Sequence, residues 1–175
     1  IEDIDKDLSD TDLIITINGT NDDPIIEVVG EGNIVYEEGL ATGSAPSDSD
    51  MASGSFTISD TDGLDDIDSV TVGGTTFVRG VDYTDLGDLV GETVDVGYGT
   101  VELTNFTNGT YDFQYTLDAT VDNDSQAGAT DAGYDESFTV AVSDGTAGMG
   151  DSAPITVNIF DDIPTAIDDG TYYVY

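Results

Sequence analysis

The chain has 175 residues, and its 38 acidic residues against two basic ones give a formal net charge of −36. Nucleic acid and anionic membrane surfaces are bound through Lys and Arg patches, so the charge excludes both as direct partners. The chain has no cysteine and no apolar run of membrane-spanning length, which excludes disulfides, zinc–thiolate sites and direct membrane insertion.

The acidic charge has to be neutralised before the chain can compact, because like charges repel one another in a folded domain. Hydrophobic residues make up 38% of the sequence, with nine Tyr and six Phe, which is more core material than an acidic disordered tail contains. Carboxylates suit hard divalent cations, so we expect bound Ca²⁺. Screening by high ambient salt is the alternative.

Strand patterns follow one another along the chain, and helix patterns are almost absent. In chain order, strands are expected at 13–18, 25–29, 55–59, 69–78 (with a Gly73-Gly74 turn), 100–116, 137–143 and 155–160, with one short helical turn at 84–90. Within 100–116, Asn108-Gly109 predicts a two-residue turn that pairs 101–106 with 111–116. Tyr111, Phe113 and Tyr115 should then face the core. Long acidic loops are expected at 38–52 and 121–135, and the whole pattern predicts an antiparallel β-sandwich.

An internal repeat indicates where domains begin and end. ITINGTNDDP at 15–24 aligns with ITVNIFDDIP at 155–164, an offset of 155 − 15 = 140 residues. Each copy is a strand followed by acidic residues and a proline. We therefore expect residues 1–23 to finish one repeat, 24–163 to form a complete one and 164–175 to open the next.

These residues also carry a family resemblance. ITINGTNDDP resembles the end of VCBS-type and cadherin-like repeats of bacterial surface proteins. GSFTISDTDGLDDIDSVTVGGTTF, YGTVELTNF, DNDSQAGATDAGYDESFTVAVSDG and VNIFDDIPTA resemble the Ig-like repeats of type I-secreted, RTX-type giant adhesins. The resemblance implies an all-β, antiparallel Ig-like/cadherin-like β-sandwich that extends a protein from a bacterial cell surface. It also implies calcium at domain junctions and a role in attachment or biofilm.

The first candidate calcium site is the junction itself, where Asn21, Asp22 and Asp23 precede Pro24 and the second copy supplies Asp161 and Asp162. A linker with several carboxylates can share an ion with loops of both neighbouring domains, and Pro24 stiffens it. An ordinary solvated acidic loop is the alternative.

Three further groups of acidic residues are candidate calcium ligands. Asp60 and Asp62, followed by Asp65 and Asp66, form a D-x-D-G loop whose spacing differs from that of an EF-hand. Glu37 or Glu38 is implied by the resemblance, because cadherin-like modules direct an early Glu toward the preceding linker. Asp122 and Asp124 lie in the second acidic loop, which an ion or plain disorder explains equally well. The alternative to a calcium site in the Asp60–Asp66 loop is an ordinary turn that is rich in Asx residues.

The sequence thus favours a calcium-stabilised extender module of a large extracellular adhesin, with neighbouring repeats of the same chain as its partners. Catalysis is not expected, because the chain has no His and no Cys. The alternatives are a ligand-binding adhesin domain for carbohydrate or a surface, and a fibre subunit that joins other copies of itself by strand addition. A halophilic domain that is acidic only for solubility is a further alternative.

Overall fold

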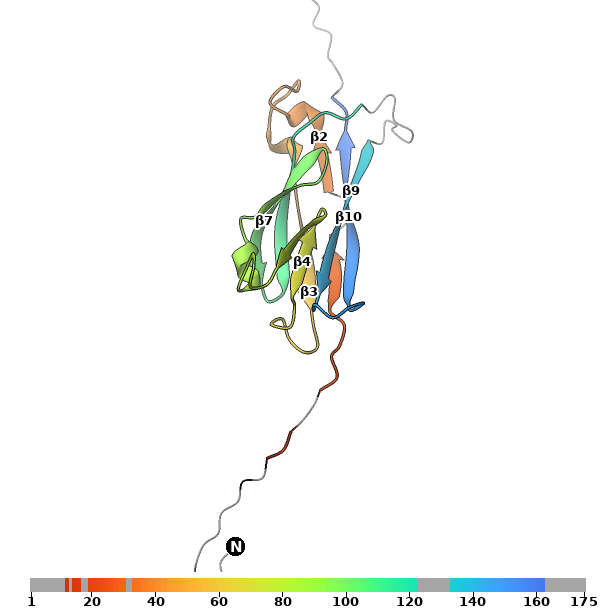
Figure 1. The fold of residues 1–175 in the computed structure, drawn as a ribbon. Helices are drawn as coiled ribbons and strands as arrows, with labels where there is room; N and C mark the ends of the chain where they lie inside the picture. Colours follow the sequence, from red (N-terminus) through yellow and green to blue (C-terminus); the bar gives the residue numbers. More distant parts are fainter. Residues whose placement is uncertain (1–11, 13, 17–18, 31–32, 123–132, 163–175) are drawn as a thin grey trace, which may run out of the picture.

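The computed structural model describes residues 12, 14–16, 19–30, 33–122 and 133–162, and nearly all of the regular structure is β-strand (Figure 1). The strands are β1 (Ile25–Val29), β2 (Asn33–Tyr36), β3 (Met51–Ser59), β4 (Ser69–Val72), β5 (Thr75–Val78), β6 (Thr93–Asp95), β7 (Gly99–Thr107), β8 (Thr110–Leu117), β9 (Tyr134–Ser143) and β10 (Gly150–Phe160). Three short 3₁₀ helices, η1 (Glu37–Gly39), η2 (Asp48–Asp50) and η3 (Leu86–Leu89), lie in the connections.

The strands form two five-stranded sheets. One has the order β1-β3-β8-β7-β6 and the other β2-β10-β9-β4-β5. The first two strands are divided between the sheets, and the strand order around β3, β8 and β7 and around β10, β9 and β4 matches that of Ig domains. The predicted all-β Ig-like sandwich is confirmed. Among the pairs formed by β1 to β10, one departs from the predicted antiparallel arrangement: β2 runs parallel to β10.

The predicted hairpin of 100–116 is confirmed. Asn108 and Gly109 have φ values of 50° and 86°, as a type I′ turn requires. The register shifts between Leu103 and Asn105, which marks a β-bulge in β7. It re-aims the end of β7 and leaves β8 unchanged. Tyr111, Phe113 and Tyr115 are accordingly buried.

Aromatic side chains connect the two sheets at the centre of the core. The rings of Phe56 and Tyr111 lie 5.3 Å apart within one sheet. Phe113 meets Phe138 of the opposite sheet edge to face, with centroids 6.1 Å apart. Such pairs add to the free energy that burial alone contributes.

A buried carboxylate is the other link between the sheets. Glu136 on β9 is only 6% exposed, and it accepts hydrogen bonds from the Tyr115 hydroxyl and, at 2.6 Å, from the Tyr98 amide. These partners compensate for the removal of the charge from water.

The sandwich runs from Ile25 to Phe160. Ile14 and Ile15, in the segment where a strand was expected, are 85% and 72% exposed, and 14–16 are not in a strand. The assignment of residues 1–23 and 164–175 to neighbouring repeats stays a prediction, and 163–175 lie outside the described residues. No helix in the described part of the chain is long and apolar enough to cross a membrane.

Candidate metal centre

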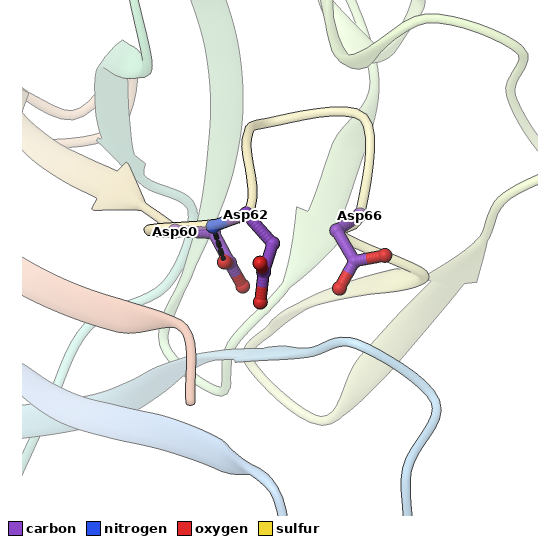
Figure 2. Close-up of side chains that lie close together, drawn as sticks. All are labelled: Asp60, Asp62 and Asp66. Carbon is purple, nitrogen blue, oxygen red and sulfur yellow. Dashed lines mark hydrogen bonds between the residues drawn. The ribbon is translucent and has the colours of Figure 1, made fainter. Parts of the chain in front are cut away.

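The acidic loop after β3 brings three carboxylates together. Oxygens of Asp60, Asp62 and Asp66 all lie within 4.8 Å of one another. Figure 2 shows the three side chains on the same side of the turn. Two oxygens on opposite sides of a bound Ca²⁺ are about 5 Å apart at most, so the spacing fits ligands of a single ion.

Main-chain hydrogen bonds fold this loop back on itself. The Asp62 amide donates to Asp60 Oδ1 at 2.7 Å, the Gly63 amide to the Asp60 carbonyl at 3.2 Å and the Asp66 amide to the Gly63 carbonyl at 3.0 Å. Gly63 has a φ of 114°, which a residue with a side chain adopts only with strain. The consecutive turns therefore hold like charges close together.

Asp60 provides the clearest sign that this loop is built to bind a cation. Its Oδ2 is buried and has no hydrogen-bond partner within the described part of the chain. A buried polar atom without a partner costs about 1–3 kcal/mol. A cation between the three carboxylates would remove this cost.

Arg79 anchors the segment that follows the acidic residues. Its guanidinium donates to the carbonyl oxygens of Leu64 at 2.9 Å, Ile67 at 2.7 Å and Thr84 at 3.2 Å. The guanidinium of Arg79 is thus used to hold main-chain carbonyls. Neutralising the carboxylates of the cluster therefore calls for a different cation.

Mutual repulsion within the cluster is visible in the pKa of Asp66. Desolvation raises this pKa above its ordinary value, and the charges of Asp60, Asp62, Asp144 and Asp65 raise it further, in that order. The charged state of the cluster is therefore disfavoured unless a cation is present.

The predicted linker residues reach this cluster. The Asp22 amide donates to Asp62 Oδ2 at 2.8 Å, and Asn21 Nδ2 donates to Asp144 Oδ2 at 2.5 Å. Asp144 lies in the turn between β9 and β10, so the linker contacts two separate loops. We call this the proximal end of the sandwich, where residues 19–24 lead into β1 (Figure 1).

A second acidic group lies at the opposite, distal end, where β10 finishes. Glu37 is 3% exposed, and its Oε1 accepts a hydrogen bond from the Val121 amide. Burial raises the pKa of Glu37, the Val121 amide lowers it, and the Asp161 carboxylate raises it again. A buried carboxylate next to a second carboxylate calls for a shared proton or a cation.

The linker that leaves the sandwich is tied to the same end. Asp162 accepts hydrogen bonds from the Ser44 amide at 2.7 Å and from the Ser44 hydroxyl at 2.5 Å. Asp50, in η2, has a buried Oδ1 without a hydrogen-bond partner among the described residues. Both ends of the sandwich thus contain a linker aspartate held by a loop and a buried carboxylate oxygen that lacks a partner.

The expected direction of the early Glu is wrong. Glu37 lies beside the following linker and not the preceding one, because β2 runs parallel to β10 and both strands end at the distal end. Glu38 is exposed.

The remaining candidates stand apart from the three-carboxylate group or outside the description. Asp65 Oδ1 lies against Gly63, where a Cβ would approach it to 2.6 Å. Asp23 is exposed, and Asp122 is exposed next to the distal Val121. Asp124 lies outside the described residues. Sequence reasoning missed Asp50 and Asp144. Asp50 forms a D-x-D pattern with Asp48 in η2, a signal that could have identified it. Asp144 is the single acidic residue in its turn, and only the fold brings it to an acidic end.

No protein-family model matches the chain, and no curated protein matches it. Among solved structures, the N-terminal Ig1-2 module of the Drosophila receptor protein tyrosine phosphatase DLAR is 13% identical, with a TM-score of 0.41. The alignment covers 79% of this chain and 50% of that module.

Two structures of the S-layer protein SbsC are also similar. Domains 4 and 5 are 15% identical, with 83% of this chain and 50% of that one covered and a TM-score of 0.39. Domains 1–6 are 16% identical, with 87% and 15% covered and a TM-score of 0.40. This chain therefore spans half or less of each of these structures, and the Ig-like assignment rests on its own strand order.

Proposed function

We propose that this chain is a calcium-stabilised structural module of a large extracellular surface protein of bacteria, acting as a spacer between neighbouring repeats. The observation that carries the proposal is the proximal cluster. Asp60, Asp62 and Asp66 converge at the point where the linker enters, and a buried oxygen of Asp60 lacks a partner.

Calcium suits these ligands and this charge. Ca²⁺ binds six to eight oxygens in a flexible geometry, so three carboxylates with carbonyls and water make a reasonable set. Extracellular modules bind it at a Kd of about 10⁻⁴–10⁻³ M, so the site would fill outside the cell and stay empty in the cytosol. Binding would then supply folding free energy to a chain of charge −36.

The internal repeat supports a junction between modules. The offset of 140 residues aligns Asp162 with Asp22 and Asp161 with Asn21. Asp162 is held by the distal loop at Ser44, and Asp22 by the proximal loop at Asp62. In a tandem array, one linker would therefore contact the distal end of one repeat and the proximal end of the next.

A junction fixed in this way sets the distance and angle between repeats, which is the mechanical property that a spacer needs. The resemblance to the repeats of RTX-type adhesins supports attachment or biofilm as the setting. No catalytic role is proposed, because a chain without His and Cys lacks most nucleophile–base arrangements.

Small-angle X-ray scattering on a two-repeat chain, residues 1–163 followed directly by 24–163, tests the spacer. At matched ionic strength, we expect a larger maximum dimension and a narrower spread of dimensions in 2 mM calcium than in chelator. This calcium concentration is about twice the weakest Kd expected for such a site. Asp161→Asn with Asp162→Asn at the internal junction should abolish the difference, and Glu102→Gln with Asp95→Asn on a sheet face should preserve it. Equal dimensions in calcium and chelator would contradict a calcium-stiffened junction.

A further inference from the structure

The outer face of the β2-β10-β9-β4-β5 sheet lacks the charge that dominates the rest of the molecule. Strand alternation places Val70, Val140 and Val157 in the core, so their neighbours along each strand point outward. The outward positions are small and uncharged over four strands; they include Thr76, Thr71, Ala141, Thr139, Pro154 and Thr156.

Strand pairing makes this neutral face continuous. Thr76, Thr71, Ala141 and Ser152 follow one another across β5, β4, β9 and β10 in register. Four strands span about 14 Å, and the seven residues from Ser137 to Ser143 along β9 span about 20 Å. Beyond Ser137 the next side chain, Glu136, points into the core, and Asp135 is the first outward carboxylate along β9.

The outer face of the other sheet provides a comparison within the same molecule. It presents Glu27 on β1, Asp95 on β6, Glu102 on β7 and Asp112 on β8, all of them exposed. Strand propensity disfavours acidic residues on both sheets alike, so it does not explain why one outer face carries a single carboxylate at its rim, Asp135, while the other carries several across its strands.

An aromatic pair lies at the distal end of the neutral face. Tyr36 on β2 is 40% exposed and stacks on Phe160 of β10, with ring centroids 5.3 Å apart and planes at 26°. Ile34, on the same side of β2, is 44% exposed. Large apolar side chains left in water next to a flat hydroxyl-bearing surface are typical of a contact site.

We propose that this neutral face, defined by the outward residues of β4, of β9 from Ser137 to Ser143 and of β10, with Tyr36 and Phe160, binds an uncharged polysaccharide. Thr and Ser hydroxyls donate and accept hydrogen bonds, as sugar hydroxyls do. The exposed ring of Tyr36 offers an apolar surface to the C–H face of a sugar and a polar hydroxyl at its edge. The field of a −36 chain repels polyanions, so a neutral polymer is the partner that this face fits.

A second copy of the chain fits less well. Two chains of this charge repel each other over a screening length of about 8 Å at physiological ionic strength, and Asp135 lies at the rim of the face. A neutral polymer meets no such repulsion. The inference shares the extracellular setting of the proposed function but does not require the calcium site, so the two can fail separately.

Affinity gel electrophoresis in calcium tests the inference, with dextran, hydroxyethylcellulose or mannan in the gel as neutral probes and hyaluronan as the anionic control. The acidic chain migrates strongly, so even weak binding retards it. We expect retardation by at least one neutral polymer. Thr139→Asp with Thr156→Asp should reduce the apparent association constant about tenfold or more, and so should Tyr36→Ala, which leaves the charge unchanged.

The matched control is Thr93→Asp with Thr104→Asp, which adds the same charge to the outer face of the other sheet and should leave retardation unchanged. Thermal unfolding confirms that each variant folds. The inference is overturned by retardation in hyaluronan alone, by no retardation in any of the three neutral polymers, or by equal losses in the two Asp pairs. Sedimentation that shows a dimer broken by the Thr139 and Thr156 changes would assign the face to a second copy and would also overturn it.

Discussion

Asp60 is the residue on which the calcium proposal depends most. We expect Asp60→Asn to remove the stabilisation that calcium provides, because the variant loses a charged ligand at the centre of the cluster. At a calcium concentration ten times Kd, one site contributes about 1.4 kcal/mol to the free energy of unfolding. In chelator the variant should equal or exceed the wild type, since one repulsive charge is gone. Urea unfolding in both conditions measures the difference.

Glu102→Gln is the matched control for this change. Glu102 is exposed on β7 and carries the same charge, but it lies on a sheet face away from the cluster. It should retain the full response to calcium. If both variants respond to calcium as the wild type does, Asp60 is not a ligand.

The raised pKa values of Glu37 and Asp66 predict a pH dependence whose sign changes with calcium. Without calcium, a carboxyl whose pKa is higher in the folded state than in the unfolded state stabilises the fold when protonated. Stability should therefore rise as pH falls from 7 through the raised pKa values, with the full gain below the ordinary values of 4.5 and 3.8. Asp88, whose pKa is lowered by the Asp85 and Thr84 amides, acts oppositely, but only below its ordinary value of 3.8.

With calcium present, acidification should instead lower stability, because protons compete with the ion for the same oxygens. Urea unfolding at pH 7 and pH 5, in calcium and in chelator, gives the four free energies required. A fall in stability with acidification in both conditions would contradict the assignment of these carboxylates to a cation site.

The sequence predicted the proximal cluster because its three residues are close in the chain. Asp60, Asp62 and Asp66 occupy one loop, and consecutive turns bring them together. The distal group could not be predicted in the same way. Glu37 and Asp161 are neighbours only because β2 pairs with β10 in parallel, which no local pattern announces.

The β7–β8 hairpin is the element whose energetics follow most directly from its sequence. Phe113 is 1% exposed between Phe56 and Phe138, so Phe113→Ala should reduce the free energy of unfolding by about 3–5 kcal/mol. Gln114→Ala on the outward side should cost well under that amount. Urea unfolding compares the two, and equal costs would place the wrong face of β8 in the core.

The turn of this hairpin provides an independent check. Gly109 has a φ of 86°, and a Cβ there would lie 2.5 Å from the Ile58 carbonyl oxygen. Gly109→Val should therefore destabilise the domain more than Gly74→Val in the β4–β5 turn, where φ is 88° but the space around the Cβ is open. Similar costs for the two would mean that backbone strain, and not the contact with β3, decides the effect.

The elements that the sequence predicted are those with strong alternation or a turn of defined type. The 3-residue β6 and the 4-residue β2 are too short to show a period, and their pairing is set by tertiary contacts. Pro154 sits inside β10, where a proline argues against a central strand. β2 pairs with β10 only from Val157 onward, so Pro154 lies where that side of β10 has no paired strand in the described structure.

For the whole molecule, the central problem is a charge of −36 on a sandwich with an ordinary core. The acidic residues that converge lie at the two ends, where the repeat pattern also places the linkers. Cation binding at these ends would relieve repulsion and fix neighbouring repeats with the same ligands. Cation binding would then account both for folding outside the cell and for the fixed spacing between repeats.

The measurement that tests this account most directly is thermal unfolding of residues 1–175 in 2 mM calcium, in 2 mM magnesium and in chelator, with sodium chloride added to match the ionic strength. Because calcium binds the folded state, the account predicts a melting temperature that rises with calcium concentration and that magnesium, with its demand for octahedral geometry, raises far less. The same melting temperature in all three solutions would show that salt screening alone stabilises the chain, and would contradict a calcium-stabilised module.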